Sequence, residues 1–159
     1  MAPVRRFSRR RPARLPQLTA AGYLPPGHWP CAWDELIRRF GQGDQRQRLV
    51  PGLQAVLREL RRAGCLVAWI DGSFVTAVPN PVDVDVCYDH RGVALSVLDP
   101  ILLPTPSARA AQRAHYGCEV FVAQMIEAET GRTFLEFFQQ RKDGRGRKGL
   151  IELDPREAP

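Results

Sequence analysis

The sequence predicts a single domain of the α/β (α+β) class, built on a small mixed β-sheet with flanking helices. Short apolar runs of strand length alternate along the chain with stretches whose apolar residues recur at helical spacing. Turns rich in glycine and proline separate these elements. A chain of 159 residues is long enough to bury the core of one such domain. We therefore expect one domain at 27–155, preceded by a tail and linker at 1–26.

The tail carries the net charge of the chain. Its first 14 residues contain six arginines, and no acidic residue precedes Asp34. Because the whole chain has 23 basic and 17 acidic residues, its formal charge of +6 equals the contribution of these arginines alone. A basic segment with few apolar residues is expected to be disordered by itself. It could bind RNA, DNA or an acidic partner through salt-dependent contacts, or it could be an inert extension.

Two helices are expected before the first strand. Apolar residues at helical spacing predict a short helix over 33–40, which the glycines of 41–43 end. A longer helix is expected at 44–63, where the leucines share one face and the arginines lie mostly off it. Pro51 lacks an amide hydrogen, so we expect a kink or a helix start near it. Gly64 is a typical residue just beyond a helix C-terminus.

The second half of the chain alternates strands and helices. An apolar strand at 66–70 leads into Gly72-Ser73, after which 74–77 is expected to form one helical turn. Further strands are expected where apolar and β-branched residues gather between turns, at 82–88, 118–123 and 149–153. Further helices are expected at 92–98, 107–115 and 130–140.

The segment between the first two of these strands holds the residues that indicate chemistry. Gly72-Ser73 follows an apolar run, and Asp83-Val84-Asp85 follows after nine intervening residues. Side chains alternate along a strand, so Asp83 and Asp85 point to the same side, about 6.5 Å apart at Cα. Two carboxylates on one face repel each other unless a cation lies between them. Hard divalent cations prefer carboxylate oxygens, so this spacing indicates a metal site. A β-hairpin with two solvent-exposed aspartates is the alternative.

This pattern resembles the signature of the DNA polymerase beta-like nucleotidyltransferases, and more closely that of their minimal single-domain bacterial members. The resemblance covers the 20 residues from Trp69 to Tyr88 and implies a nucleotidyltransferase-like fold. It implies that Gly72 and Ser73 hold a nucleoside triphosphate, and that Asp83 and Asp85 bind Mg²⁺ or Mn²⁺. Asp71 departs from the pattern, because the position before the glycine is usually hydrophobic. It would be either an additional carboxylate at the metal or an acid that caps the turn.

The same resemblance implies a third acid on the adjacent strand, where it helps to bind metal and takes the proton of the attacking hydroxyl. Glu119 is the candidate here, because it begins the apolar strand at 118–123. Aspartate is more usual at this position in the superfamily, and a solvent-facing glutamate at a strand edge is the alternative. Glu127 and Glu129 are substitutes in an expected loop.

A basic hairpin precedes the last expected strand. Residues 141–149 hold five cationic side chains around two inner glycines. Flexible cations beside an acidic metal site could bind a triphosphate or an RNA backbone. Lys148 is the candidate for a phosphate contact, because it borders the strand at 149–153 and would be held in place by it. A solvated hairpin tip is the alternative.

These residues together predict a metal-dependent nucleotidyltransferase. Asp83, Asp85 and Glu119 would bind the metal and carry catalysis. Gly72, Ser73 and Lys148 would bind ATP or another nucleoside triphosphate. The acceptor would be a hydroxyl of RNA, such as tRNA, or of a partner protein, and by analogy the protein would belong to a toxin–antitoxin pair. The alternative is a module on the same fold that binds a nucleotide, RNA or a partner without chemistry.

Other classes of protein are not indicated. No apolar run approaches the ~18 residues that a membrane span requires, and the first residues lack the apolar stretch of a signal peptide. A cytoplasmic location is therefore expected. The four cysteines lack a Cys-x-x-Cys spacing, which argues against a zinc site.

Overall fold

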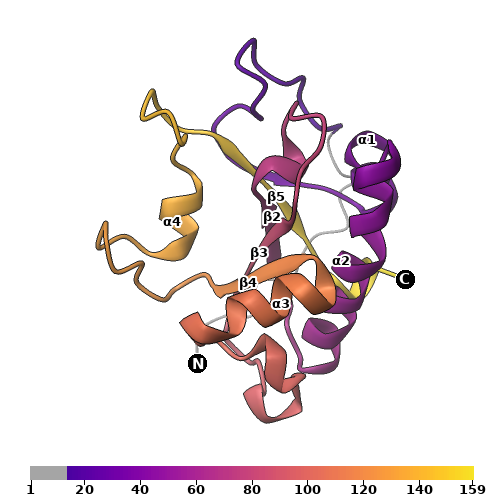
Figure 1. Ribbon diagram of the computed structural model, residues 1–159, viewed down its shortest axis with the longest axis vertical. Helices are drawn as coiled ribbons and strands as arrows, with labels where there is room; N and C mark the ends of the chain where they lie inside the picture. The colour runs from indigo at the N-terminus through magenta and orange to yellow at the C-terminus, as the bar shows by residue number, and fades with distance from the viewer. Residues whose placement is uncertain (1–13) are drawn as a thin grey trace.

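Five strands form one mixed sheet in the computed structural model, which describes residues 14–159 (Figure 1). The strand order across the sheet is β1-β5-β2-β3-β4. The strands are β1 (Gly27–Pro30), β2 (Ala68–Asp71), β3 (Val84–Tyr88), β4 (Cys118–Val122) and β5 (Gly149–Leu153). Strand β1 pairs parallel with β5, and β3 pairs parallel with β4, whereas β2 is antiparallel to both of its neighbours. The predicted fold class is confirmed.

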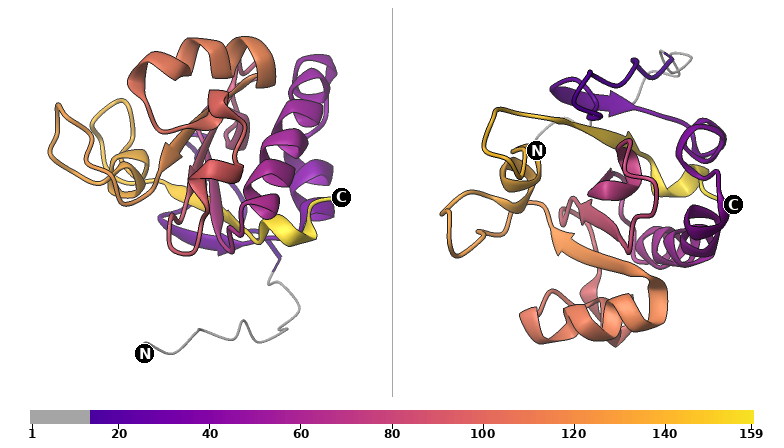
Figure 2. Two further views of the ribbon diagram at one scale, coloured as in Figure 1. Left: turned by 90° about the horizontal axis from the view of Figure 1, so that it is seen from below. Right: turned by 45° about the horizontal axis from the view of Figure 1, so that its top comes forward.

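Helices cover both faces of this sheet. They are α1 (Trp33–Phe40), α2 (Asp44–Arg62), α3 (Arg109–Tyr116) and α4 (Phe134–Phe138). Helices α1 and α2 lie on one side of the strands and α4 on the other, as Figures 1 and 2 show. Because strand side chains alternate, Ile70 and Val86 join the core with α2, while Trp69 and Cys87 join the smaller core with α4. No helix of the described residues is long and apolar enough to cross a membrane.

Helix α2 begins at Asp44 and continues through Pro51 to Arg62, so the expected helix start near Pro51 is wrong. A proline inside a helix costs about 3 kcal/mol. The face of α2 that carries Leu53, Val56 and Leu57 is fully buried against the sheet. Burial of one such side chain contributes about 1.5–3 kcal/mol, so the packed face outweighs the lost backbone hydrogen bond.

Two other expected helices are shorter than the sequence indicates. Of 92–98 only the 3₁₀ turn Leu95–Val97 is helical, because the backbone bonds elsewhere: the Ala94 N–H donates to the carbonyl of Ala63 at 2.9 Å. Helix α4 begins only at Phe134, because Thr133 and Glu136 cap its start reciprocally. Strand β1 is an element that the sequence analysis does not anticipate.

The part of the tail and linker that the structure describes, 14–26, is fixed to the domain. Leu15 and Leu24 are buried, and the carbonyl of Leu24 accepts a hydrogen bond from the amide of Gly149 at 2.9 Å. This segment therefore packs as part of the domain and leads directly into β1. The five arginines of the tail before Arg14 lie outside the described residues.

Candidate active site

Three carboxylates lie in register across three neighbouring strands. Asp71, the last residue of β2, is the pairing partner of Asp85 in β3. Asp85 is in turn the partner of Glu119 in β4. Paired residues of adjacent strands point to the same side of a sheet, so these three acids share the face that also carries α4. We call Asp71, Asp85 and Glu119 the carboxylate row.

The turn after β2 brings the backbone against this row. Gly72 has φ 78° and ψ −170°, a conformation that glycine adopts readily and other residues avoid. A Cβ atom at Gly72 would lie 2.4 Å from the Oδ2 atom of Asp85, a distance that requires something to shift. The backbone conformation therefore favours glycine, and any larger residue would also require the Asp85 carboxylate to shift. Ser73 follows at once, half-buried, as the first residue of the 3₁₀ turn Ser73–Val75.

Negative charge is concentrated at Asp85. Burial is the largest cause that raises the pKa of Asp85, to about 7, and the charges of Asp71, Asp83 and Glu119 add to it. The positive charge of Lys142 in the basic hairpin acts in the opposite direction. Asp83 itself is half-buried and directly precedes β3. This arrangement favours binding of a cation, because a positive ion beside Asp85 would stabilise its ionised form.

Asp71 and Lys148 form an ion pair inside the protein. The Nζ atom of Lys148 lies 3.2 Å from Oδ1 and 3.3 Å from Oδ2 of Asp71. Both residues are buried: the exposed fraction is 5% for Lys148 and 1% for Asp71. Burial raises the pKa of Asp71, and the charge of Lys148 offsets part of that effect. The described partner of Lys148 is thus the carboxylate of the residue before Gly72, and the predicted contact of Lys148 with a phosphate stays a prediction.

Glu119 also has a cationic partner. Its Oε1 atom accepts a hydrogen bond from Nη1 of Arg113, which α3 places above the start of β4. The described residues contain no group of three or more His, Cys, Asp or Glu side chains arranged to hold a metal ion. The donor set nevertheless suits magnesium, which commonly takes one or two carboxylates and completes its shell with phosphate oxygens and water. Asp83 and Asp85 are the two carboxylates that the sequence pattern indicates for this role.

Arg46 is a residue of the site that the sequence analysis misses. It lies in α2 with an exposed fraction of 9%, and burial lowers the pKa of its guanidinium. It donates hydrogen bonds to four backbone carbonyls, three of which belong to the segment after Ser73. The acceptors are the oxygens of Phe40 at 3.2 Å, Phe74, Thr76 at 2.9 Å and Val78 at 2.5 Å. Arg46 therefore holds the turn that carries Gly72 and Ser73 against α2.

The sequence contained a signal for this role. Arg46 precedes Leu49 by three residues and Leu53 by seven, so it lies on the buried stripe of α2 rather than off it. The neighbouring Gln45 supports the same segment, because its Nε2 atom donates to the carbonyl of Pro81 at 2.9 Å.

Comparison with known proteins gives one family. A model of a family of unknown function, DUF6932, matches residues 16–154. The chain belongs to this family. No curated protein and no solved structure matches the DUF6932 chain. The family match supports neither a named superfamily nor a reaction.

Proposed function

We propose that this DUF6932 protein is a metal-dependent nucleotidyltransferase. The observation that carries the proposal is the carboxylate row beside Gly72. Asp71, Asp85 and Glu119 lie in register on one face, and the turn that would hold a triphosphate comes so close to Asp85 that a Cβ atom at Gly72 would lie 2.4 Å from its Oδ2 atom. A hairpin with a purely structural role has no need for three acids in register, of which Asp71 is buried and Asp85 and Glu119 are half-buried.

The proposed reaction moves a nucleoside monophosphate from a triphosphate to a hydroxyl. The acceptor oxygen attacks the α-phosphorus, the bond from that phosphorus to the bridging oxygen breaks, and pyrophosphate leaves. The proton of the hydroxyl passes to the carboxylate of Glu119. Catalysis of this kind consists mostly of positioning and charge stabilisation.

The residues of the chain divide this work between them. Asp83 and Asp85 would hold Mg²⁺ or Mn²⁺, which when bound neutralises the carboxylates and the triphosphate oxygens. Gly72 and Ser73 let the backbone approach the phosphates, and Arg46 keeps their turn in place. Lys148 and Lys142 supply positive charge on the same side of the sheet. The acceptor hydroxyl belongs to RNA or to a partner protein, and by analogy the pair would be a toxin and its antitoxin.

One observation favours a second candidate, a nucleotide-binding module without chemistry. Both outer acids of the row already have cationic partners, since Lys148 pairs with Asp71 and Arg113 pairs with Glu119. If these pairs persist with nucleotide bound, Glu119 is not free to accept a proton.

The test is incorporation of labelled nucleotide. The protein is incubated with each α-labelled nucleoside triphosphate, with Mg²⁺ or Mn²⁺, and with either total RNA or a protein extract. We expect metal-dependent transfer of label that Asp83→Asn with Asp85→Asn abolishes. Asp34→Asn with Glu157→Gln removes two exposed acids elsewhere and serves as the matched control. Metal-dependent binding without transfer would favour the second candidate, and no binding would contradict both.

A further inference from the structure

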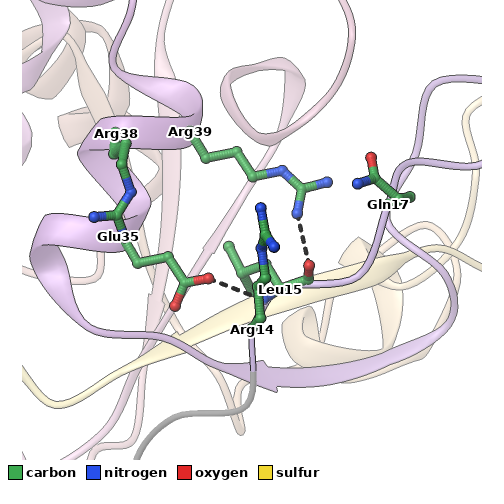
Figure 3. Close-up of a pocket in the computed structure, with 6 residues that line it drawn as sticks. All are labelled: Arg14, Leu15, Gln17, Glu35, Arg38 and Arg39. Carbon is green, nitrogen blue, oxygen red and sulfur yellow. Dashed lines mark hydrogen bonds between the residues drawn. The ribbon is translucent and has the colours of Figure 1, made fainter.

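The surface beside α1 contains a hollow of about 520 Å³ that shares no residue with the carboxylate row. Its lining comes from the segment that leads into the domain and from one side of α1 (Figure 3). The residues that line it are Arg14, Leu15, Gln17, Glu35, Arg38 and Arg39.

Two hydrogen bonds fix this hollow. The amide of Leu15 donates to Oε1 of Glu35 at 2.9 Å, and its carbonyl accepts from Nη1 of Arg39 at 2.9 Å. The side chain of Leu15 is buried at the floor. The walls are therefore held by hydrogen bonds between the backbone of Leu15 and two side chains of α1, without a ligand.

The hollow is positively charged. Three arginines line it against one glutamate, and one oxygen of that glutamate accepts a hydrogen bond from the amide of Leu15. Arg14 and Arg39 extend toward the same space above Leu15 (Figure 3). Among the described residues no salt bridge involves Arg14, Arg38 or Arg39. An anion that enters such a space reduces the repulsion between the like charges around it.

The chemistry of the lining indicates phosphate groups. Guanidinium forks bind phosphate oxygens in pairs, and arginine is the cation used for such contacts. The lining holds no aromatic ring, so bases would have no stacking platform and only the backbone of a nucleic acid would be bound. The tail arginines at 5–11 continue the same positive charge along the sequence, immediately before Arg14.

We propose that this hollow is a binding surface for the phosphate backbone of single-stranded RNA. A duplex presents its phosphates on a stiff convex surface, whereas a single strand can bend into a concave site. The contact is independent of base sequence, and it does not depend on nucleotide transfer at the carboxylate row. It adds a second site to the proposed function and places an RNA partner on the α1 side of the molecule.

The experiment measures binding of a fluorescent single-stranded RNA to the full chain by anisotropy, across about 50 to 200 mM salt. The test variant is Arg14→Gln with Arg38→Gln, which spares Arg39 and its bond to Leu15. The control is Arg48→Gln with Arg61→Gln, which removes two exposed arginines of α2. Arg61 lies in the last turn of α2 as Arg38 lies in the last turn of α1, and the control pair removes the same charge as the test pair.

We expect the test variant to bind RNA roughly 10- to 30-fold more weakly at 0.1 M salt, and its salt slope to fall by about 1.4, because single strands release about 0.7 counterions per contact. The control should bind as the wild type does. Equal losses in both variants would overturn the proposal in favour of net charge alone. Tighter binding of duplex RNA, or binding of a polyglutamate peptide but not of RNA, would also overturn it. Equal binding of single-stranded DNA would support the phosphate contact as its basis.

Discussion

Lys148 and Asp71 meet inside the protein, with the ammonium 3.2 Å from the nearer carboxylate oxygen. The two residues are 77 positions apart in the sequence, and the pairing of β2 with β5 brings them together. Asp71 lies beside Asp85 and directly before Gly72, so this pair connects the basic hairpin to the proposed phosphate-binding turn. Buried pairs of this kind are costly to break, because the remaining charge has no partner.

Lys148→Ala should lower the free energy of unfolding by about 3–5 kcal/mol at pH 7 to 8. Burial already raises the pKa of Asp71, and loss of the cation raises it further. The folded variant then binds a proton that the unfolded chain releases, so its stability should recover as pH falls through the raised pKa. Denaturant unfolding at several pH values measures this, with the exposed Arg145→Ala as control, expected within about 0.5 kcal/mol of wild type. A pH-independent loss in Lys148→Ala would contradict the ion pair.

Asp85 should make the metal-free protein less stable as pH rises. Its pKa of about 7 in the fold exceeds the ordinary value of 3.8, so the folded chain binds the extra proton between these values. Stability is therefore greatest below about pH 4 for this group, and it falls by up to about 1.4 kcal/mol per pH unit until the pH passes about 7.

Two changes should remove this dependence on pH. Asp85→Asn cannot ionise, and it should stabilise the metal-free protein at pH 8 by relieving repulsion within the carboxylate row. Saturating Mg²⁺ should stabilise the wild type most at high pH, where Asp85 is ionised. Thermal melts at pH 5 and pH 8, with and without Mg²⁺, measure both effects. A Mg²⁺ effect that is the same in Asp85→Asn would argue against this residue as a ligand.

Gly72→Ala tests the close approach of the turn to Asp85. The residue has φ 78° and an added Cβ would lie 2.4 Å from an oxygen of Asp85. Gly92 has almost the same φ, 79°, with no atom within 4 Å of an added Cβ. Gly92→Ala should cost about 1–2 kcal/mol, the strain of the left-handed backbone alone. Gly72→Ala should cost more, because its ψ of −170° adds backbone strain and the added Cβ requires Asp85 to shift. It should also weaken nucleotide binding, which calorimetry would measure. Equal costs and unchanged binding would mean that the approach has no consequence.

Arg46→Met should release the segment that follows Ser73. Four carbonyls lose their donor, which should cost on the order of 3 kcal/mol or more. Arg46→Lys keeps the charge but cannot reach all four acceptors. The stability and nucleotide affinity of this variant should therefore lie between those of Arg46→Met and those of the wild type. Arg48→Met, two residues along on the exposed face of α2, is the control. If Arg46→Met lowers the stability but leaves the nucleotide affinity at the wild-type value, then Arg46 stabilises the fold and has no role in nucleotide binding.

Local patterns in the sequence predict much of the structure. The helix at 33–40 and the strand at 149–153 have the bounds that their apolar spacing indicates. The α/β class, the turn at Gly72 and the alternation that sends Asp85 to one face follow in the same way. These features depend on side-chain period and on turn residues, which are properties of adjacent positions.

Features that depend on distant residues were decided by the tertiary structure. Helix α2 passes through Pro51 because its apolar face is buried against the sheet. The segment 92–98 is mostly not helical, because its Ala94 amide donates a hydrogen bond to the carbonyl of Ala63 at the end of α2. Strand β1 forms because its backbone pairs with that of β5.

The candidate site divides in the same way. The sequence by itself determined which residues could serve it, namely the Gly72-Ser73 turn, Asp83, Asp85, Glu119 and Lys148. Only the tertiary structure decided that Asp71 joins the carboxylate row, that Lys148 and Arg113 pair with its outer members, and that Arg46 fastens the turn. The physical reason is that strand order and register join residues far apart in the chain. The burial that results, which raises the pKa of Asp85 and orients Arg46, exists only in the folded protein.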